Sequence, residues 1–457
     1  GDPAIRSGLM SLPSRRAFLG SASAAAAFAQ SPPARRPNIL LVMADDFGFE
    51  CLNCYGGTSY RTPNLDRFAR SGLRFTHAFA QPLCTPTRLQ LMTGQLNFRN
   101  WKSFGVMAPQ ELTFGHMMQR AGYRTAIAGK WQLYSYDAPG SKYRGTGKRP
   151  ADGGFDEYLL WHDEHSEKKG SRYADPVLNH NGKLVPNTKG KYGPDLFTDF
   201  LLDFMRRQPD QPFFAYYPMA LTHGPFNATP RSEDWPRGDR LKDDPRHFAD
   251  MVAYLDADFG RLIDGLDRLG LASNTLVLFY SDNGSPPEIT SRLGSRIVPG
   301  GKRLTTEAGM HVPMLARWSG VTPVNKTCDD LIDSTDFLPT IAEATGAQWF
   351  PKLPLDGRSF LPQLRGAKGN PRDALFSHFD PHPSCKADIK PTRLAWDHQH
   401  KLYLDGRLYD WKADPLEEKP LANAPAARAK LQRVLEQYAR IQPPKFNKFE
   451  PDGKPAY

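Results

Sequence analysis

The chain has 457 residues, of which 40% are hydrophobic and 11% aromatic, so it can bury a large core. Its formal net charge of +10 is a moderate excess that raises the local concentration of anionic ligands. The sequence has no Lys/Arg run and no interleaved stacking aromatics, so nothing in it indicates nucleic-acid binding. Five cysteines are too few for a disulfide scaffold of this length, and Cys51-x-x-Cys54 is at best half of a zinc site.

The first 29 residues are typical of an export signal. Ser14-Arg15-Arg16-Ala17-Phe18-Leu19 resembles a twin-arginine motif, and Ala27-Phe28-Ala29 suits a cleavage site after a weakly apolar stretch. This stretch is too short and too rich in alanine to span a bilayer stably, and no later segment is long and apolar enough. We therefore expect a signal peptide over 1–29, export by the twin-arginine machinery, and a periplasmic or secreted bacterial protein with no stable membrane span.

Four apolar runs of strand length are each followed by polar side chains. The runs are 38–44, 123–128, 213–219 and 275–281, and the residues that follow them include Asp45-Asp46, Gly129-Lys130, His223 and Asp282-Asn283. Such continuous runs predict strands covered on both faces, in a mostly parallel α/β sheet flanked by helices. A helical pattern from Val252 to Leu269, stopped by Gly270, lies between the third and fourth runs. Because ligands bind beyond the carboxyl ends of parallel strands, we expect these polar groups to converge.

The C-terminal part has a different pattern. A Pro/Gly-rich stretch over 350–372 predicts a linker after a catalytic domain over 37–349. Short strand-like pieces at 374–378 and 401–404 precede a helix whose apolar positions run from Leu431 to Ile441. We predict a smaller α+β subdomain over 373–442 and an extended or disordered tail over 443–457.

The segment 84–94 carries the decisive motif. Cys84-Thr85-Pro86-Thr87-Arg88, followed by Leu91, Thr93 and Gly94, resembles the sulfatase signature, in which the cysteine is oxidised after translation to formylglycine. Further matches follow in order along nearly the whole mature chain. They include 37–46, Thr62-Pro63-Asn64-Leu65-Asp66, Gly129-Lys130-Trp131, Asp282-Asn283-Gly284, 301–307 and Leu408-Tyr409-Asp410. The sequence therefore resembles the formylglycine-dependent type I sulfatases, which implies the fold of the alkaline phosphatase superfamily.

Hydrolysis of a sulfate ester explains why the cysteine would be modified. A sulfated thiol would need a separate hydrolytic step, whereas an aldehyde hydrate offers one hydroxyl to attack sulfur and a second to expel sulfate. Pro86 suits the first turn of a helix, which would place residue 84 at the positive end of that helix. Arg88 lies four residues on, where it could contact the hydrate.

Asp45, Asp46, Asp282 and Asn283 offer the oxygen ligands that Ca²⁺ or Mg²⁺ prefers, and residue 84 would complete the site. The spacing does not choose between the two ions, but the resemblance implies calcium. The resemblance also identifies Lys130 and Lys302 with two sulfate-binding lysines. By the same resemblance, His223 matches the histidine that contacts the sulfate, and we expect it to protonate the departing alcohol.

Three residues depart from the family pattern. Thr87 replaces the usual serine, which is a mild change because the C-x-P-x-R core is intact. Gln132 stands where a histidine is common; it can hydrogen-bond the hydrate or the sulfate but cannot exchange protons near neutral pH. His311 stands where arginine is commoner. We expect His223 to carry more of the proton transfer.

The leading hypothesis is sulfate ester hydrolysis, on a sulfated carbohydrate or an aryl sulfate, after a maturation enzyme has generated formylglycine at Cys84. The cationic and aromatic segments 161–165 and 285–298, the latter with Arg292 and Arg296, are expected to border the pocket and suit a sulfated sugar. One alternative is a phosphonate monoester or phosphodiester hydrolase of the same superfamily, disfavoured because the predicted metal ligands are oxygens only. A second is a non-catalytic sulfoglycan-binding protein in which Cys84 stays a thiol.

Overall fold

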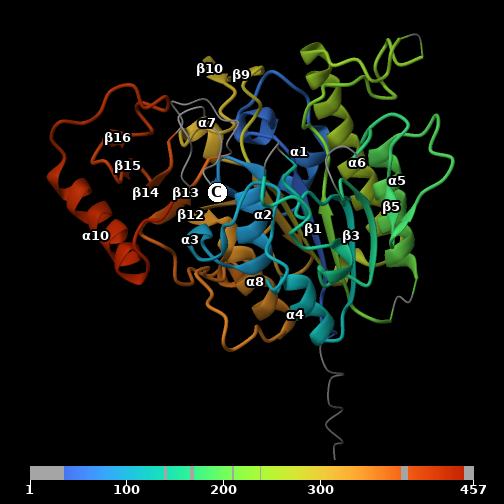
Figure 1. Cartoon of the computed structure of the whole chain (residues 1–457), viewed down its shortest axis with the longest axis horizontal. Coiled ribbons are helices and arrows are strands. Elements are labelled where there is room, and N and C mark those ends of the chain that lie inside the picture. The colour runs from blue at the N-terminus through green and yellow to red at the C-terminus, as the bar shows by residue number, and fades with distance from the viewer. Residues whose placement is uncertain are drawn as a thin grey trace, which may run out of the picture. The chain divides into compact units, whose positions relative to one another are not determined.

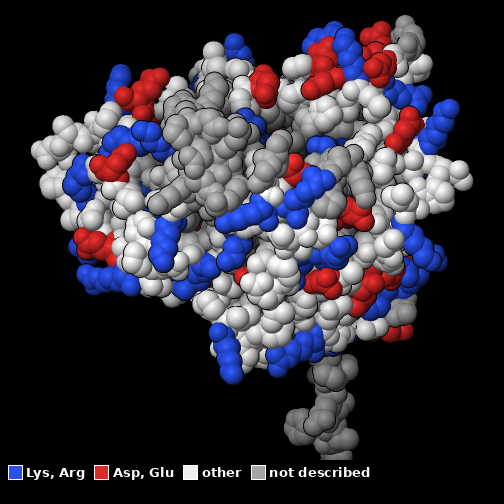
Figure 2. Space-filling view, viewed as in Figure 1, with Lys and Arg blue, Asp and Glu red and all other residues white. Residues whose placement is uncertain are grey.

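Figure 1 shows a computed structural model of the chain, which describes residues 35–137, 141–164, 169–207, 210–236, 238–381 and 390–446. The described residues from Arg36 onward belong to one compact unit. The predicted signal peptide and most of the predicted tail lie outside the described residues. On the face shown in Figure 2, Lys and Arg side chains are spread widely and interspersed with Asp and Glu.

Ten strands of the described chain form one sheet. In spatial order they are β12 (Lys326–Asp333), β2 (Leu73–Phe79), β11 (Met314–Trp318), β8 (Thr275–Ser281), β1 (Asn38–Ala44), β7 (Phe213–Pro218), β3 (Arg124–Lys130), β4 (Glu157–Trp161), β5 (Asn179–His180) and β6 (Lys183–Leu184). The central run from β8 to β4 is parallel throughout, and β11, β5 and β6 join antiparallel. The prediction of a mostly parallel sheet is confirmed.

Helices cover both faces of this sheet. In β1, alternate side chains enter different cores: Leu40 and Val42 pack with α1 (Pro63–Arg70), α5 (Gly193–Arg206) and α6 (Phe248–Arg268). Leu41 and Met43 pack with α2 (Cys84–Thr93), α4 (Phe114–Arg120) and α8 (Phe337–Thr345). Side chains alternate along a strand, so an uninterrupted apolar run is the pattern of a strand that is buried on both faces. Figure 1 shows the two sets of helices on either side of the sheet.

A smaller antiparallel sheet forms from the C-terminal part of the chain. It consists of β13 (Leu375–Phe379), β14 (Thr392–Trp396), β15 (His400–Tyr403) and β16 (Leu408–Asp410). One face packs on α10 (Pro425–Ile441) through Leu431 and Leu435. The other face packs on Phe79 and Met310 of the larger part. The two sheets therefore share a buried apolar boundary.

The structure contains the predicted strands and helices, with small shifts in their bounds. The run 38–44 and the run 275–281 are strands over their whole length, whereas the strand predicted at 123–128 extends to Lys130. The segment predicted as a linker, 350–372, contains α9 (Leu361–Leu364) and packs Phe360 and Leu364 into the core. The domain boundaries placed around that segment stay a prediction. No helix among the described residues has both the length and the apolar character needed to cross a membrane.

Candidate active site

The carboxyl ends of β1 and β8 bring four of the predicted metal ligands together. The two strands pair in parallel with Ala44 opposite Ser281, so Asp45-Asp46 and Asp282-Asn283 leave the sheet side by side. The Asp46 backbone N–H donates to Asp282 Oδ1 at 3.1 Å, and Asn283 Nδ2 donates to Asp46 Oδ1 at 2.7 Å. All four side chains are buried. The convergence expected from the sequence is therefore present for these residues.

Helix α2 places Cys84 and Arg88 against this acidic group. Cys84 is the first residue of the helix and is fully buried. Arg88 lies one turn on, with Nη2 at 3.1 Å from Asp282 Oδ2 and 3.6 Å from Asp45 Oδ2. The free backbone N–H groups and the dipole of a helix N-terminus favour an anionic group at the position of Cys84.

Thr87 fixes the start of this helix to the sheet. Its hydroxyl donates to the Asp282 carbonyl at 2.6 Å and accepts from the Gln81 backbone N–H at 3.0 Å. Both contacts use the hydroxyl, which serine and threonine share. The replacement of the family's serine by Thr87 therefore keeps the connection between α2 and the metal-ligand strand end.

Two lysines, one at the end of a strand and one in a loop, each contact one of the neighbouring carboxylates Asp45 and Asp46. Lys130 ends β3, and its Nζ lies 2.7 Å from Asp45 Oδ2. Lys302 Nζ lies 2.6 Å from Asp46 Oδ2, and both lysines are buried. Gly129, just before Lys130, has φ of 127°, and a Cβ there would lie 1.9 Å from the Pro218 carbonyl oxygen. This glycine lets β3 approach β7 closely enough to bring Lys130 to the site.

His223 lies beside the acidic group and faces it with Nε2. Its Nδ1 lies 2.6 Å from the Gly224 carbonyl oxygen, so we assign the proton to Nδ1 and a lone pair to Nε2. Nε2 lies 3.7 Å from Asp46 Oδ2. Burial, together with the ammonium groups of Lys302 and Lys130, lowers the pKa of His223 well below its ordinary value. A neutral imidazole at this position can bind a cation or accept a proton.

Gln132 reaches the predicted nucleophile although it replaces the family's histidine. Its Oε1 lies 3.6 Å from Cys84 Sγ, and its backbone N–H donates to the His162 carbonyl at 3.0 Å. Its φ of 52° turns the chain sharply after Lys130. The position therefore keeps its place at the site while losing the capacity to transfer protons near neutral pH.

Charge is unevenly compensated among the buried acids. Burial raises the pKa of Asp45, but Lys130, His223 and Arg88 outweigh this effect and hold it well below the usual range. Burial and the Asp45 carboxylate raise the pKa of Asp282, and Arg88 opposes them only in part. Burial also raises the pKa of the Cys84 thiol, so the unmodified side chain is protonated and a poor nucleophile at neutral pH.

The residues at the strand ends fit a hard divalent cation. Asp45 Oδ1 and Asn283 Oδ1 are buried and have no hydrogen-bond partner among the described residues. A cation beside them would use both oxygens and relieve the repulsion between Asp45 and Asp282. Possible ligand atoms of Asp45, Asp46 and His223 lie within 4.8 Å of one another. The structure thus adds an imidazole to the oxygen ligands predicted from the sequence.

Arg172 and His162 are two site neighbours that the motifs did not single out for a role. Arg172 is buried, with Nη1 at 3.1 Å from His223 Nδ1 and its guanidinium 3.7 Å from the centre of the Trp161 ring. His162 is buried, follows β4, and neither ring nitrogen has a partner within the described chain. His162 lies in the segment 161–165, which was expected to border the pocket, whereas no sequence signal pointed to Arg172 because a loop separates it from β4.

Other predicted residues have structural contacts. His311 stacks on Phe49 at 4.0 Å, and its Nε2 lies 2.9 Å from the Thr76 carbonyl oxygen. Arg296 lies in the β9–β10 hairpin (Thr290–Leu293 and Arg296–Pro299) and pairs with Glu307 at 2.6 Å. Cys51, Cys54, Cys84 and Cys328 are free thiols, and Cys385 and His165 lie outside the described residues.

Comparison with known proteins agrees with this geometry. A family model described as Sulfatase matches residues 37–347, and one described as N-sulphoglucosamine sulphohydrolase, C-terminal, matches residues 301–442. Arylsulfatase A of Homo sapiens is 35% identical over 421 residues, which cover 84% of this chain and 78% of that protein. N-acetylgalactosamine-6-sulfatase of Homo sapiens is 31% identical, over 72% of this chain and 66% of that protein. The crystal structure of Ps i-CgsB superposes with a TM-score of 0.72 at 25% identity, over 90% of this chain and 95% of that one.

The fold, the strand-end residues and these similarities together define a sulfuric ester hydrolase. The chain belongs to the sulfatase family, within the alkaline phosphatase superfamily.

Proposed function

We propose that this sulfatase hydrolyses sulfate esters of a carbohydrate with formylglycine at residue 84 and a divalent cation, calcium rather than magnesium, at Asp45, Asp46, Asp282 and Asn283. The observation that carries the proposal is the position of Cys84, buried at the N-terminus of α2 within reach of Gln132 and beside the acidic group. After oxidation, residue 84 would supply two hydroxyls on one carbon, one to accept the sulfuryl group and one to expel it. The cation would supply Lewis acidity toward a sulfate oxygen and the attacking hydroxyl.

The chain's own residues would bind the sulfate and manage its charge. Lys130, at the end of β3, and Lys302, in a loop, pair with Asp45 and Asp46, so their ammonium groups would neutralise charge that develops on the non-bridging oxygens. Arg88 of α2 pairs with Asp45 and Asp282 and so orients these two cation ligands. Gln132 would hydrogen-bond the hydrate or a sulfate oxygen.

His223 would handle the proton of the departing alcohol. Its Nε2 faces the site, and on the opposite side of the ring Nδ1–H donates to the Gly224 carbonyl. Burial and the lysines beside it lower the pKa of His223 and keep the ring neutral in the free protein. A bound sulfate ester brings negative charge that offsets these lysines, so substrate binding would raise the pKa of His223 toward the range of a general acid.

A sulfated carbohydrate is the proposed substrate class. The support is the N-acetylgalactosamine-6-sulfatase among the relatives, together with Arg172 beside His223, which offers a cation to a charged sugar. An aryl sulfate is the alternative. We also propose export by the twin-arginine pathway to the periplasm or beyond and maturation by a formylglycine-generating enzyme, on the strength of the sequence motifs alone.

Mass spectrometry and one substitution test the nucleophile. Protein matured in a host that installs formylglycine should carry a residue-84 peptide about 18 Da lighter than the unmodified cysteine peptide. Cys84→Ala should lower kcat by at least about 10⁴-fold because the group that accepts the sulfuryl moiety is gone. The matched control is Cys54→Ala, a half-buried thiol that is not among the predicted site residues, which should retain activity. A free thiol at residue 84 in fully active enzyme would refute the proposal.

A phosphonate monoester hydrolase is the second candidate, and His223 is the observation that favours it. The sequence argument against it was a ligand set of oxygens only, whereas His223 lies with Asp45 and Asp46 in one potential metal-binding group. Comparing kcat/KM for an aryl sulfate and for the matching aryl phosphonate separates the two activities. We expect the sulfate to be preferred, and a preference for the phosphonate would reverse the assignment.

A further inference from the structure

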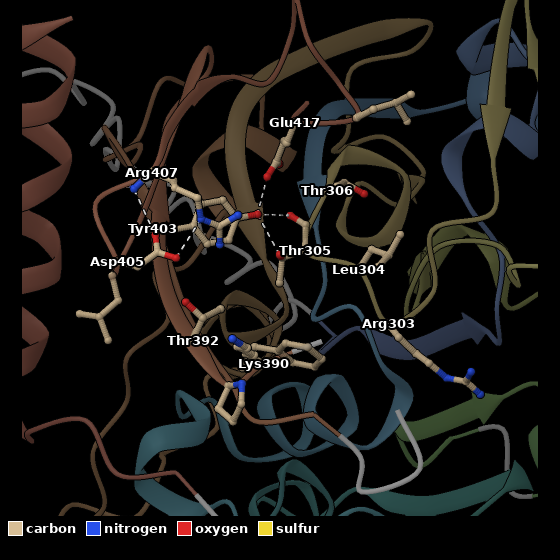
Figure 3. A pocket seen from close by; sticks show the side chains of 14 residues that line it. Arg303, Leu304, Thr305, Thr306, Lys390, Thr392, Tyr403, Asp405, Arg407 and Glu417 are labelled. Carbon is tan, nitrogen blue, oxygen red and sulfur yellow. Dashed lines mark hydrogen bonds and ion pairs between the residues drawn. The ribbon is translucent and has the colours of Figure 1, made fainter. Parts of the chain in front are cut away.

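A cavity opens directly beside the loop that carries Lys302. It has a volume of about 600 Å³ and lies between residues 303–306 and the C-terminal strands β14 and β15 (Figure 3). Hydroxyl groups of Thr305, Thr306, Thr392 and Tyr403 line it. Apolar surface comes from Leu304, Phe379, Pro391 and Leu416. This mixture of hydroxyls and apolar surface suits a sugar ring, which presents both hydroxyls and C–H faces.

Buried polar contacts hold the wall of this cavity in place. Lys401 donates from Nζ to the Thr305 carbonyl at 2.5 Å and pairs with Glu417 Oε1 at 2.7 Å. Tyr403 donates its hydroxyl to the other Glu417 oxygen and lies 2.8 Å from Thr305 Oγ1. We call these four residues the Tyr403 network. Because the network fixes Thr305, it fixes the loop in which Lys302 and Arg303 lie.

Arg303 connects the cavity to the catalytic loop. It follows Lys302 directly, so the two Cα atoms are about 3.8 Å apart. The Lys302 side chain turns into the strand-end site, whereas Arg303 lines the cavity. Figure 3 shows its side chain extending away from Tyr403 and Glu417. Its φ of 79° is a conformation that a residue other than glycine adopts at a cost of about 1 kcal/mol or more, so a glycine at this position could keep the same backbone without that cost.

The charge that this cavity leaves available is positive. Its two acids are engaged, Glu417 by Lys401 and Asp405 by Arg407 at 2.8 Å. Arg303 and Lys390 form no ion pair within the described chain, and Lys390 is exposed. Two cations among hydroxyl groups form the pattern that binds a sulfate group on a carbohydrate.

We propose that this cavity binds a second sulfated sugar unit of the same glycan whose ester lies at Lys302. The inference rests on the proposed function and narrows it: the substrate is an oligosaccharide with at least two sulfate groups. Lys390 holds the second sulfate within the cavity, Arg303 contacts the same glycan where its side chain leaves the cavity, and the apolar wall packs on the sugar ring. An aryl monosulfate reaches only the strand-end site and gains nothing from the cavity.

Binding of a defined polysulfated disaccharide tests the proposal without requiring turnover. Sucrose octasulfate is titrated calorimetrically into the full-length protein that carries Cys84→Ala, in millimolar calcium. Arg303→Gly suits the positive φ and should leave the fold intact. Arg303→Gly and Lys390→Ala should each weaken binding by about tenfold because each removes one charge-assisted contact. Arg246→Ala, at an exposed arginine paired with Asp244, is the control and should change binding by less than about twofold.

Inorganic sulfate and turnover assays separate the possible outcomes. Sulfate binds at the strand-end lysines under this proposal, so its affinity should be the same in Arg303→Gly as in the parent protein. If Arg303→Gly and Lys390→Ala lose no more octasulfate affinity than the control Arg246→Ala, the cavity assignment is overturned. Ester hydrolysis by the wild-type enzyme would still support the proposed function in that case. Failure of the wild-type enzyme on every sulfate ester, with cavity-dependent octasulfate binding intact, would instead refute the proposed function.

Discussion

The strand-end residues and the Tyr403 network are both buried clusters of charge, but they differ in how completely their polar atoms are paired. In the network, Lys401, Glu417, Tyr403 and Thr305 leave no buried side-chain polar atom without a partner within the described chain. At the strand ends, Asp45 Oδ1, Asn283 Oδ1 and Arg88 Nε have none there. A buried polar atom without a partner costs free energy, so it persists where a ligand or a reaction uses it.

The difference teaches which cluster stabilises the protein and which serves chemistry. The network joins the loop after Lys302 to the C-terminal sheet, and every contact in it can form without a ligand. The strand ends concentrate three carboxylates and raise the pKa of Asp282 through burial and repulsion from Asp45. We therefore expect substitutions in the first cluster to change stability and those in the second to change activity.

The largest expected effect is the loss of the cation ligand Asp282. Asp282→Asn should lower kcat/KM by about 10³-fold because it weakens charge stabilisation in the transition state. In the wild-type protein, calcium at 100 times its Kd should stabilise the fold by about 2.7 kcal/mol, and this gain should be much smaller in the variant. Thermal unfolding with calcium and with EDTA measures it. Half-buried Asp244, which pairs with Arg246, offers the control Asp244→Asn. Equal calcium stabilisation of Asp282→Asn and wild type would contradict the predicted ligand set.

Substitutions in the Tyr403 network should lower stability more than activity. Glu417→Gln leaves the Lys401 ammonium buried without a carboxylate and should lower the free energy of unfolding by about 3–5 kcal/mol. The double variant Lys401→Met/Glu417→Leu should recover most of that loss. Urea unfolding measures both, with Asp405→Asn in the exposed Arg407 pair as a control expected to lose less than about 1 kcal/mol. An unfolding midpoint for Glu417→Gln that matches the wild type would show that the network does not stabilise the fold.

Two buried histidines, His162 beside the active site and His378 in the C-terminal sheet, allow the stability of the two regions to be compared as a function of pH. Burial, helped by Lys169, lowers the pKa of His162 to about 3, and burial with Arg393 lowers that of His378 to about 3. Below pH 6.5 the unfolded chain binds these protons and the folded chain does not, so stability present above pH 6.5 is lost as the pH falls toward 3. Each histidine should account for about 2.7 kcal/mol of lost stability at pH 4.5.

Substitution of each histidine isolates its contribution. His162→Gln and His378→Gln should each flatten the loss of stability between pH 6.5 and 4.5, whereas exposed His180→Gln should not. At pH 8, His378→Leu should destabilise the fold more than His162→Leu does. His378 accepts a hydrogen bond from Arg393 Nε at 3.1 Å, whereas His162 has no such partner within the described chain. Identical pH profiles for wild type and both glutamine variants would mean that these rings take up protons in the folded state.

Much of this architecture could be predicted because it depends on local pattern. Apolar runs such as 38–44 identify strands buried on both faces, and the topology then places Asp45 and Asp282 together without knowledge of any loop. Arg172 could not be found in this way, because a long loop after β4 brings it to His223 and no periodicity fixes the path of that loop. The Tyr403 network was missed for a related reason, since its partners come from residues 305, 401, 403 and 417 and meet only through tertiary packing.

The sequence predicted that Gln132 lies at the active site but not how the missing histidine affects proton transfer. Substitution of Gln132 has the smallest expected effect on activity. Gln132 Oε1 lies 3.6 Å from Cys84 Sγ, so a histidine there would reach the same group and titrate near neutral pH. Gln132→His should change kcat by less than about tenfold but add an ionisation to the pH profile of kcat/KM. Gln132→Asn, which cannot titrate, should add none. A profile for Gln132→His that superposes on the wild type would show that proton transfer at this position does not limit the reaction, and that His223 alone suffices.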